Sequence, residues 1–135
     1  MNIEELRRIR NKNVQQQNML AYLEMEREAE HFRSQPQSHP WLLAVLERFG
    51  QEPTGGLLIS CSSVPEQGGM QWMGTWLTSD KRFFEFDVMA DYSSGELLEV
   101  DQWYEYQPTV SAHCKGIGKS HAYIALELLG KFEKS

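Results

Sequence analysis

The hydrophobic pattern of this chain changes its period near Gly55, and that change constrains the fold more than any other feature of the sequence. Before Gly55, apolar residues recur at the spacing of one helix face. Over residues 55–107, four short segments follow that are separated by turn-forming residues; the first is rich in β-forming and small residues, and in the later ones apolar and polar residues alternate. Helices that are segregated from strands along a chain are typical of an α+β domain.

Three helical segments are predicted around this region. Residues 1–34 form an N-terminal helical segment, either one long helix broken near residues 11–13 or a short helix followed by a long one, because asparagine side chains there compete for backbone hydrogen bonds. Residues 40–50 form a short buried helix between a first-turn proline and a closing glycine. Residues 119–132 form a C-terminal helix whose apolar stripe covers the sheet.

The four alternating segments predict an antiparallel meander, because their connections are short. Phe84 and Phe86 are expected on one face, with Glu85 and Asp87 on the other. In the last strand, plain alternation places Val100 opposite Trp103. With 135 residues, the whole chain is expected to form a single domain, residues 1–135.

The charge of the chain is negative and unevenly distributed. The sequence holds 19 acidic residues against 13 lysines and arginines, a net charge of −6. Between Glu85 and Glu105 there are seven acidic residues and no basic one. Such a block repels nucleic-acid phosphates and attracts positively charged proteins. We therefore expect a basic protein partner and no nucleic acid.

Aromatic residues stand among these acids, in the segment DQWYEY that begins at Asp101. Aromatic anchors surrounded by charges complementary to the partner are suited to protein recognition. The predicted partner-binding residues are Glu85, Asp87, Glu99, Asp101, Trp103 and Glu105. The chain carries no complete catalytic motif, so a non-catalytic role is favoured, with no cofactor and no metal expected.

In size, acidity and the acidic aromatic strand face, the chain resembles the small immunity proteins of bacterial toxin systems, which bind and block a co-produced toxin. The resemblance implies a basic toxin domain, often a nuclease, as the partner, and steric occlusion of its active site as the mechanism. Small phage-encoded inhibitors share this composition.

A second interpretation is a pocket between the sheet and the helices that binds a small molecule or performs catalysis. The residues expected to line it are Trp72, Trp76, His113, Cys114, Lys119 and His121. Among them, two histidines and a cysteine could hold zinc with a fourth ligand such as Cys61, although their spacing matches no recognised zinc motif.

The glycine-rich stretch before the last helix suits a small anion, because it leaves backbone N–H groups open beside a lysine. The predicted anion-binding residues are Gly116, Gly118, Lys119 and Ser120. The leading glycine of a Walker A loop is replaced by His113, and too few residues follow Ser120 to complete a parallel α/β sheet.

The start of the chain does not resemble a secretory signal, and no apolar run approaches the roughly 20 residues that span a bilayer. We therefore expect a cytoplasmic protein with no membrane association and with Cys61 and Cys114 reduced. The apolar stripe of the N-terminal helix also offers a surface for a homodimer.

Overall fold

The computed structural model describes residues 2–108 and 119–134, and it confirms an α+β fold. The elements in chain order are α1 (Ile3–Ser34), the 3₁₀ turn η1 (Pro36–Ser38), α2 (Pro40–Arg48), β1 (Leu57–Glu66), β2 (Gly69–Leu77), β3 (Phe83–Asp91), β4 (Leu97–Tyr106) and α3 (Lys119–Glu133). The four strands form one sheet in the order β1-β2-β3-β4, and each neighbouring pair is antiparallel, as the short connections predicted.

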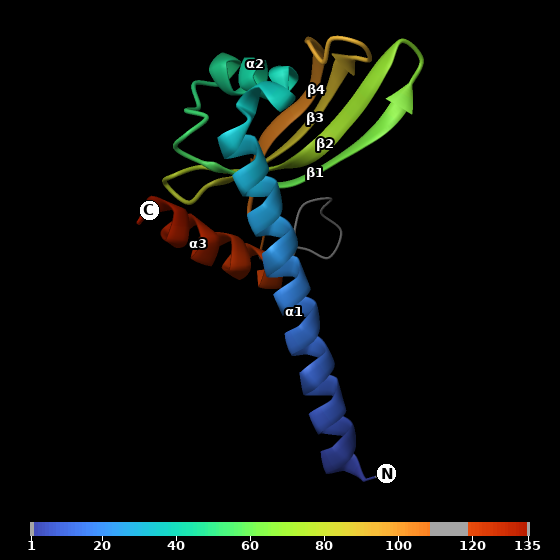
Figure 1. Ribbon diagram of the computed structural model, residues 1–135, viewed down its shortest axis with the longest axis vertical. Coiled ribbons are helices and arrows are strands. Elements are labelled where there is room, and N and C mark those ends of the chain that lie inside the picture. The colour runs from blue at the N-terminus through green and yellow to red at the C-terminus, as the bar shows by residue number, and fades with distance from the viewer. Residues whose placement is uncertain (1, 109–118, 135) are drawn as a thin grey trace.

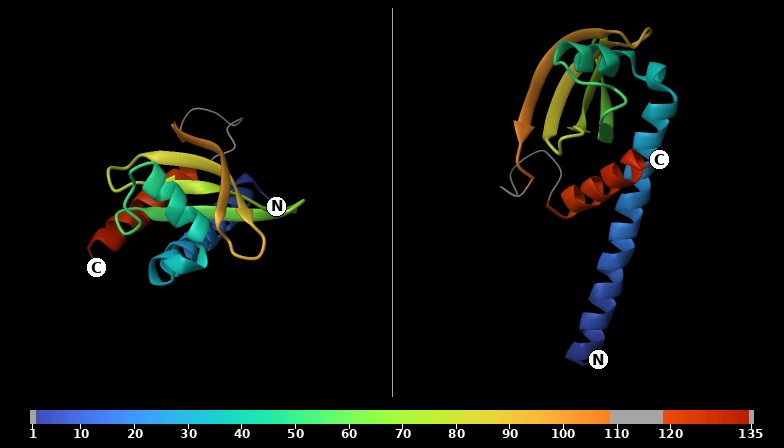
Figure 2. Two further views of the ribbon diagram at one scale, coloured as in Figure 1. Left: turned by 90° about the horizontal axis from the view of Figure 1, so that it is seen from above. Right: turned by 90° about the vertical axis from the view of Figure 1, so that its left-hand side faces the viewer.

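The helices lie on different sides of this sheet (Figure 1). Helix α1 runs beside the edge strand β1 and then projects well beyond the rest of the molecule, so that the N-terminus lies at its far end (Figure 2). Helix α3 crosses the C-terminal half of α1, where Tyr22, Met25 and Ala29 pack in the same cluster (Figure 2). None of the described helices is both long enough and apolar enough to cross a membrane.

Helix α1 is continuous, so the expected break near residues 11–13 is wrong. The Asn2 side chain accepts a hydrogen bond from the Glu5 backbone N–H at 2.8 Å and caps the first turn. Glu4 and Glu5 also place negative charge at the positive end of the helix dipole. The helix-propensity penalty of an asparagine is only about 0.7 kcal/mol, which strong helix formers on both sides outweigh.

One face of the sheet is covered by α2 and the end of α1. Trp76, which is completely buried, pairs with Phe84 across the strands, so both side chains point to this face. Trp41 of α2 lies against Trp72 and Phe86, with ring centroids 4.9 and 5.6 Å apart. The buried residues of this aromatic cluster are Phe32, Trp41, Leu42, Val45, Leu46, Leu58, Trp76, Phe84, Phe86, Val88 and Ala90.

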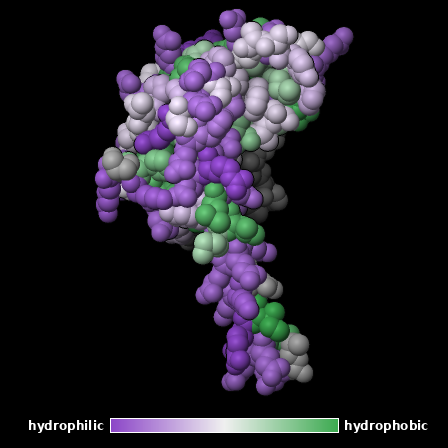
Figure 3. Space-filling view, in the orientation of Figure 1, coloured by the Kyte–Doolittle hydropathy of each residue, from purple (hydrophilic) through white to green (hydrophobic). Residues whose placement is uncertain are grey.

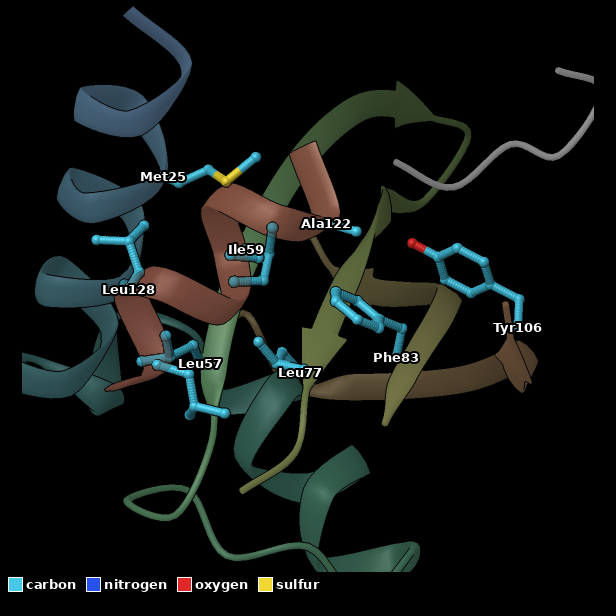
Figure 4. Close-up of a cluster of buried hydrophobic side chains, with 11 residues drawn as sticks. Met25, Leu57, Ile59, Leu77, Phe83, Tyr106, Ala122 and Leu128 are labelled. Carbon is cyan, nitrogen blue, oxygen red and sulfur yellow. The ribbon is translucent and has the colours of Figure 1, made fainter. Parts of the chain in front are cut away.

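Among the described residues, the opposite face is covered at one end, where α3 packs between α1 and the strands (Figure 4). Leu77 pairs with Phe83, one position along from Trp76 and Phe84, so these two side chains point to the α3 side. The buried residues of this second cluster are Met25, Ala29, Leu57, Ile59, Leu77, Phe83, Tyr106, Ala122, Ala125, Leu128 and Leu129.

Two irregularities in β4 change which side chains share a face. The register shifts between Asp87 and Val88 and again between Met89 and Ala90. Each shift adds one residue to β4, so alternation across it is reversed. Val100 and Trp103 therefore both pack against the aromatic cluster, and the expectation that they lie on opposite faces is wrong.

Gly74 allows β1 and β2 to approach closely over Phe86. A Cβ atom at this position would lie 2.2 Å from the Ser60 carbonyl oxygen and 2.6 Å from the Phe86 ring. Gly74→Ala should therefore lower the free energy of unfolding by at least about 2 kcal/mol, because backbone and ring must both shift. Urea denaturation measures the change.

Gly130 provides the matched control, since a Cβ there meets nothing within 4 Å in the interior of α3. Gly130→Ala should raise stability by about 0.5–1 kcal/mol through helix propensity. Equal destabilisation by the two substitutions would show that the close strand approach is not what requires Gly74.

Candidate functional site

Four of the six predicted partner-binding residues lie on the sheet face that points away from α2. Glu85 and Asp87 alternate with Phe84 and Phe86 of the aromatic cluster, and they pair with Tyr104 and Gln102 of β4. Two further acids lie on β4. Glu99 pairs with Met89, and Asp101 is the extra residue of β4 at the register shift between Asp87 and Val88. We name Gln71, Glu85, Asp87, Glu99 and Asp101 the carboxylate face.

Gln71 holds two of these carboxylates together. Its side-chain nitrogen donates a hydrogen bond to Asp101 Oδ2 at 2.8 Å and another to Asp87 Oδ1. Because one amide nitrogen carries two N–H donors, it can serve both acids at once. The bridge links β2, β3 and β4 and orients both carboxylates without neutralising their charge.

Glu85 is the most buried acid of this face, with 9% of its surface exposed. The Tyr104 hydroxyl donates a hydrogen bond to Glu85 Oε2 at 2.8 Å. Hydrogen bonds to a charged acceptor are stronger than neutral ones, and a buried carboxylate without them is costly. This bond fixes the position of the Glu85 carboxylate.

The other two predicted residues, Trp103 and Glu105, point to the opposite face, so they do not share a surface with the other four. The indole of Trp103 stacks between Phe49 and Phe84, with ring centroids 4.9 and 5.1 Å away. It is a half-buried member of the core rather than a neighbour of the carboxylates.

Arg82 neutralises Glu105 locally. Its guanidinium donates two parallel hydrogen bonds, at 3.0 Å from Nε to Oε2 and 2.9 Å from the terminal nitrogen to Oε1. These hydrogen bonds lower the pKa of Glu105 and raise that of Arg82. Glu105 is therefore separated from the carboxylate face both by position and by charge compensation.

No base lies within the strands to offset the remaining acids. None of the four strands contains a lysine, an arginine or a histidine. Their acidic residues are Glu66, Glu85, Asp87, Asp91, Glu99, Asp101 and Glu105. Half-buried methionines, Met73 and Met89, stand beside the carboxylates on the same face and provide adaptable apolar contact.

A cleft of about 280 Å³ lies between α1, β1 and α3. It is lined by Ala21, Glu24, Met25, Glu28, Ile59, Ser60, Cys61 and His121. Of the residues expected to line a pocket, His121 does so, whereas Trp72 and Trp76 belong to the aromatic cluster instead. A pocket between the sheet and the helices is thus present, with a different lining.

Beside this cleft, the structure brings together three side chains that can ligate a metal. The ligand atoms of Glu28, His39 and Cys61 all lie within 4.8 Å of one another. Glu28 and His39 were absent from the sequence prediction, because the three residues come from α1, the start of α2 and β1 and share no motif spacing. The sequence points only to Cys61, as a fourth ligand to other residues.

Several predicted site residues lie outside the described part of the chain. They are His113, Cys114, Gly116 and Gly118. Lys119 and Ser120 form the first turn of α3, where the sequence places the start of the last helix. The anion-binding interpretation stays a prediction.

Comparison of the chain with protein-family models, curated proteins and solved structures gave no match.

The hydrogen bond between Tyr104 and Glu85 yields a direct test of how firmly the carboxylate face is built. Tyr104→Phe should lower the free energy of unfolding by about 1–3 kcal/mol, because a buried carboxylate loses a donor while the ring is retained. Tyr123→Phe is the control, since Tyr123 is 63% exposed. Chemical denaturation of both variants checks this, and equal stabilities would mean that Glu85 does not depend on the hydroxyl.

Proposed function

We propose that this protein is a non-catalytic binding protein whose carboxylate face recognises a basic protein partner and blocks it sterically, in the manner of the immunity proteins it resembles. The observation that carries the proposal is the placement of four carboxylates on one sheet face, in a sheet whose strands contain no base. Like charges gathered on a rigid sheet create a field that steers an oppositely charged partner and increases its association rate.

Hydrogen bonds hold the carboxylates of this face in fixed positions, which favours specific recognition of a partner in addition to electrostatic attraction. Asp87 and Asp101 share the Gln71 amide, and Glu85 is held by Tyr104. A partner's lysines and arginines would therefore meet carboxylates that are already positioned, which reduces the entropy lost on binding. Met73 and Met89 supply apolar area beside the charges, where a partner can exclude water.

The test is affinity capture from the native host at low salt, with the wild-type chain and a neutralised variant as baits. The variant carries Asp87→Asn, Glu99→Gln and Asp101→Asn, which keep shape and remove charge. We expect the wild type to retain a basic protein that high salt releases, and the variant to bind that protein about 10-fold more weakly once it is purified, since each exposed charge contributes up to about 1 kcal/mol.

A matched control removes three exposed acids elsewhere, with Glu47→Gln, Glu52→Gln and Glu127→Gln. It changes the net charge equally and should bind as the wild type does. If both triple variants weakened binding equally, only the net charge of the protein would matter. If neither variant nor high salt changed the affinity for the partner, the proposed binding face would be refuted. Thermal unfolding verifies that each variant is folded.

We also propose that the projecting part of α1 pairs with a second copy of the chain. Every side chain described in residues 2–20 is exposed (Figure 3). The apolar stripe of α1 consists of Leu6, Ile9, Leu20 and Leu23, all at least 46% exposed. A helix stretch of this length has marginal stability in water without a packing partner.

The position of this stripe favours a helix partner. At about 100° per residue, the stripe lies opposite Met25 and Ala29, which face the core. Positions 13 and 16 lie between the pair Leu6 and Ile9 and the pair Leu20 and Leu23, so the steps from Leu6 to Leu23 are three and four residues in alternation, the repeat of a coiled-coil seam. A second copy supplies an identical seam, which is the simplest way to bury it.

Leu20→Glu with Leu23→Glu should convert a dimer to a monomer, because two charges would enter the seam. Asn11→Glu with Asn18→Glu adds the same charge on the opposite side of α1 and should leave the dimer intact. Sedimentation equilibrium over a range of concentrations measures the mass. A wild-type chain that remains monomeric at the highest concentration would refute the pairing.

A further inference from the structure

A cluster of three potential metal ligands lies where α1, the start of α2 and β1 meet, away from the carboxylate face. Cys61 pairs with Gly74 in the register that directs its side chain to the α2 side of the sheet. Glu28 approaches from α1, and His39 is the residue before the first turn of α2. All three side chains are partly buried, and their ligand atoms lie within 4.8 Å of one another.

The aromatic cluster fixes the His39 ring in this position. The ring stacks on Phe32, with centroids 6.2 Å apart and planes 15° from parallel, and it also contacts Trp41 and Trp72 at 5.4 and 5.2 Å. Its Nδ1 atom is buried and has no well-aligned hydrogen-bond partner among the described residues, although the Ser38 backbone interacts with the imidazole. A buried polar atom in a fixed ring needs a hydrogen-bond partner or a metal ion. The unprotonated nitrogen of an imidazole can donate its lone pair to a metal ion.

The Glu28 side chain is partly buried and lines the cleft. Among the residues that the structure describes it forms no hydrogen bond or salt bridge, although His31 interacts with it electrostatically. A bound cation would offset the negative charges of a thiolate and a carboxylate that lie this close together.

The donor set matches zinc. Thiolate, imidazole and carboxylate are the three groups that bind Zn²⁺ in proteins, and together they would neutralise its two positive charges. Bonds of about 2.0–2.3 Å in tetrahedral geometry place ligand atoms roughly 3.3–3.6 Å apart, so side-chain rotations that close about 1 Å would suffice. The 280 Å³ cleft borders Glu28 and Cys61 and gives water access to a fourth position.

We propose that Glu28, His39 and Cys61 form a binding site for a zinc-type transition-metal ion. The ion links three separate elements, α1, the start of α2 and β1, and water from the cleft completes its coordination. Because these residues and the carboxylate face point to opposite sides of the sheet, the metal site is independent of the proposed partner surface.

The test uses the full chain, freed of metal by a chelator and then titrated with Co²⁺, which reports its ligands in its absorption spectrum. We expect one equivalent to bind, with a thiolate-to-cobalt charge-transfer band and the visible bands of a tetrahedral ion, and Zn²⁺ to displace it. Cys61→Ser should abolish the charge-transfer band and weaken Zn²⁺ binding by about 100-fold or more, since even second-shell changes cost 10–100-fold.

Cys114→Ser is the matched control, because it removes the other cysteine of the chain, and its charge-transfer band should be unchanged. Glu28→Gln should weaken binding while the sulfur band persists. X-ray absorption of the zinc-loaded wild type should show one sulfur among nitrogen and oxygen neighbours, a result that does not depend on any variant folding. Absence of saturable binding at micromolar metal, a band that survives in Cys61→Ser, or a zinc environment without sulfur would each overturn the proposal.

Discussion

The packing of α2 against the aromatic side of the sheet is the interaction on which the rest of the structure depends. The Trp41 indole lies on Trp72 and against Phe86, and large aromatic surfaces of this kind contribute most of the burial energy of a small core. Because α2 occupies this side, the acids that alternate with Phe84 and Phe86 must point the other way. One packing contact therefore determines which face of the sheet can carry charge.

The same contact positions the cluster beside the cleft. Pro40 begins α2, so the residue before it, His39, is held where the helix meets the sheet. The ring is then confined between Phe32 and Trp72, close to Cys61. The packing of α2 on the sheet thus positions both the carboxylate face and the proposed metal ligands, which lie on opposite sides of the strands.

Helix α3 covers the remaining side at the end of the sheet where Leu57, Leu77, Phe83 and Tyr106 lie. Phe83 and Tyr106 contact it, while Glu85 and Tyr104, the next residues of the same face, interact with each other instead. The boundary between covered and charged surface falls between these two cross-strand pairs. A short C-terminal helix is therefore enough to close the core and still leave most of the carboxylate face uncovered by α3.

The sequence alone predicted the α+β fold, the meander order and that Glu85 and Asp87 lie on the face opposite Phe84 and Phe86, because alternation is a local property that one strand carries by itself. It misplaced Val100, since a strand irregularity leaves no signature in hydrophobic spacing, and it overestimated how strongly asparagines interrupt α1. Only the tertiary structure joined Gln71 to two acids across three strands and brought Glu28, His39 and Cys61 together. Such contacts depend on strand register and helix docking, which are decided by how distant segments pack and not by the order of residues within any one of them.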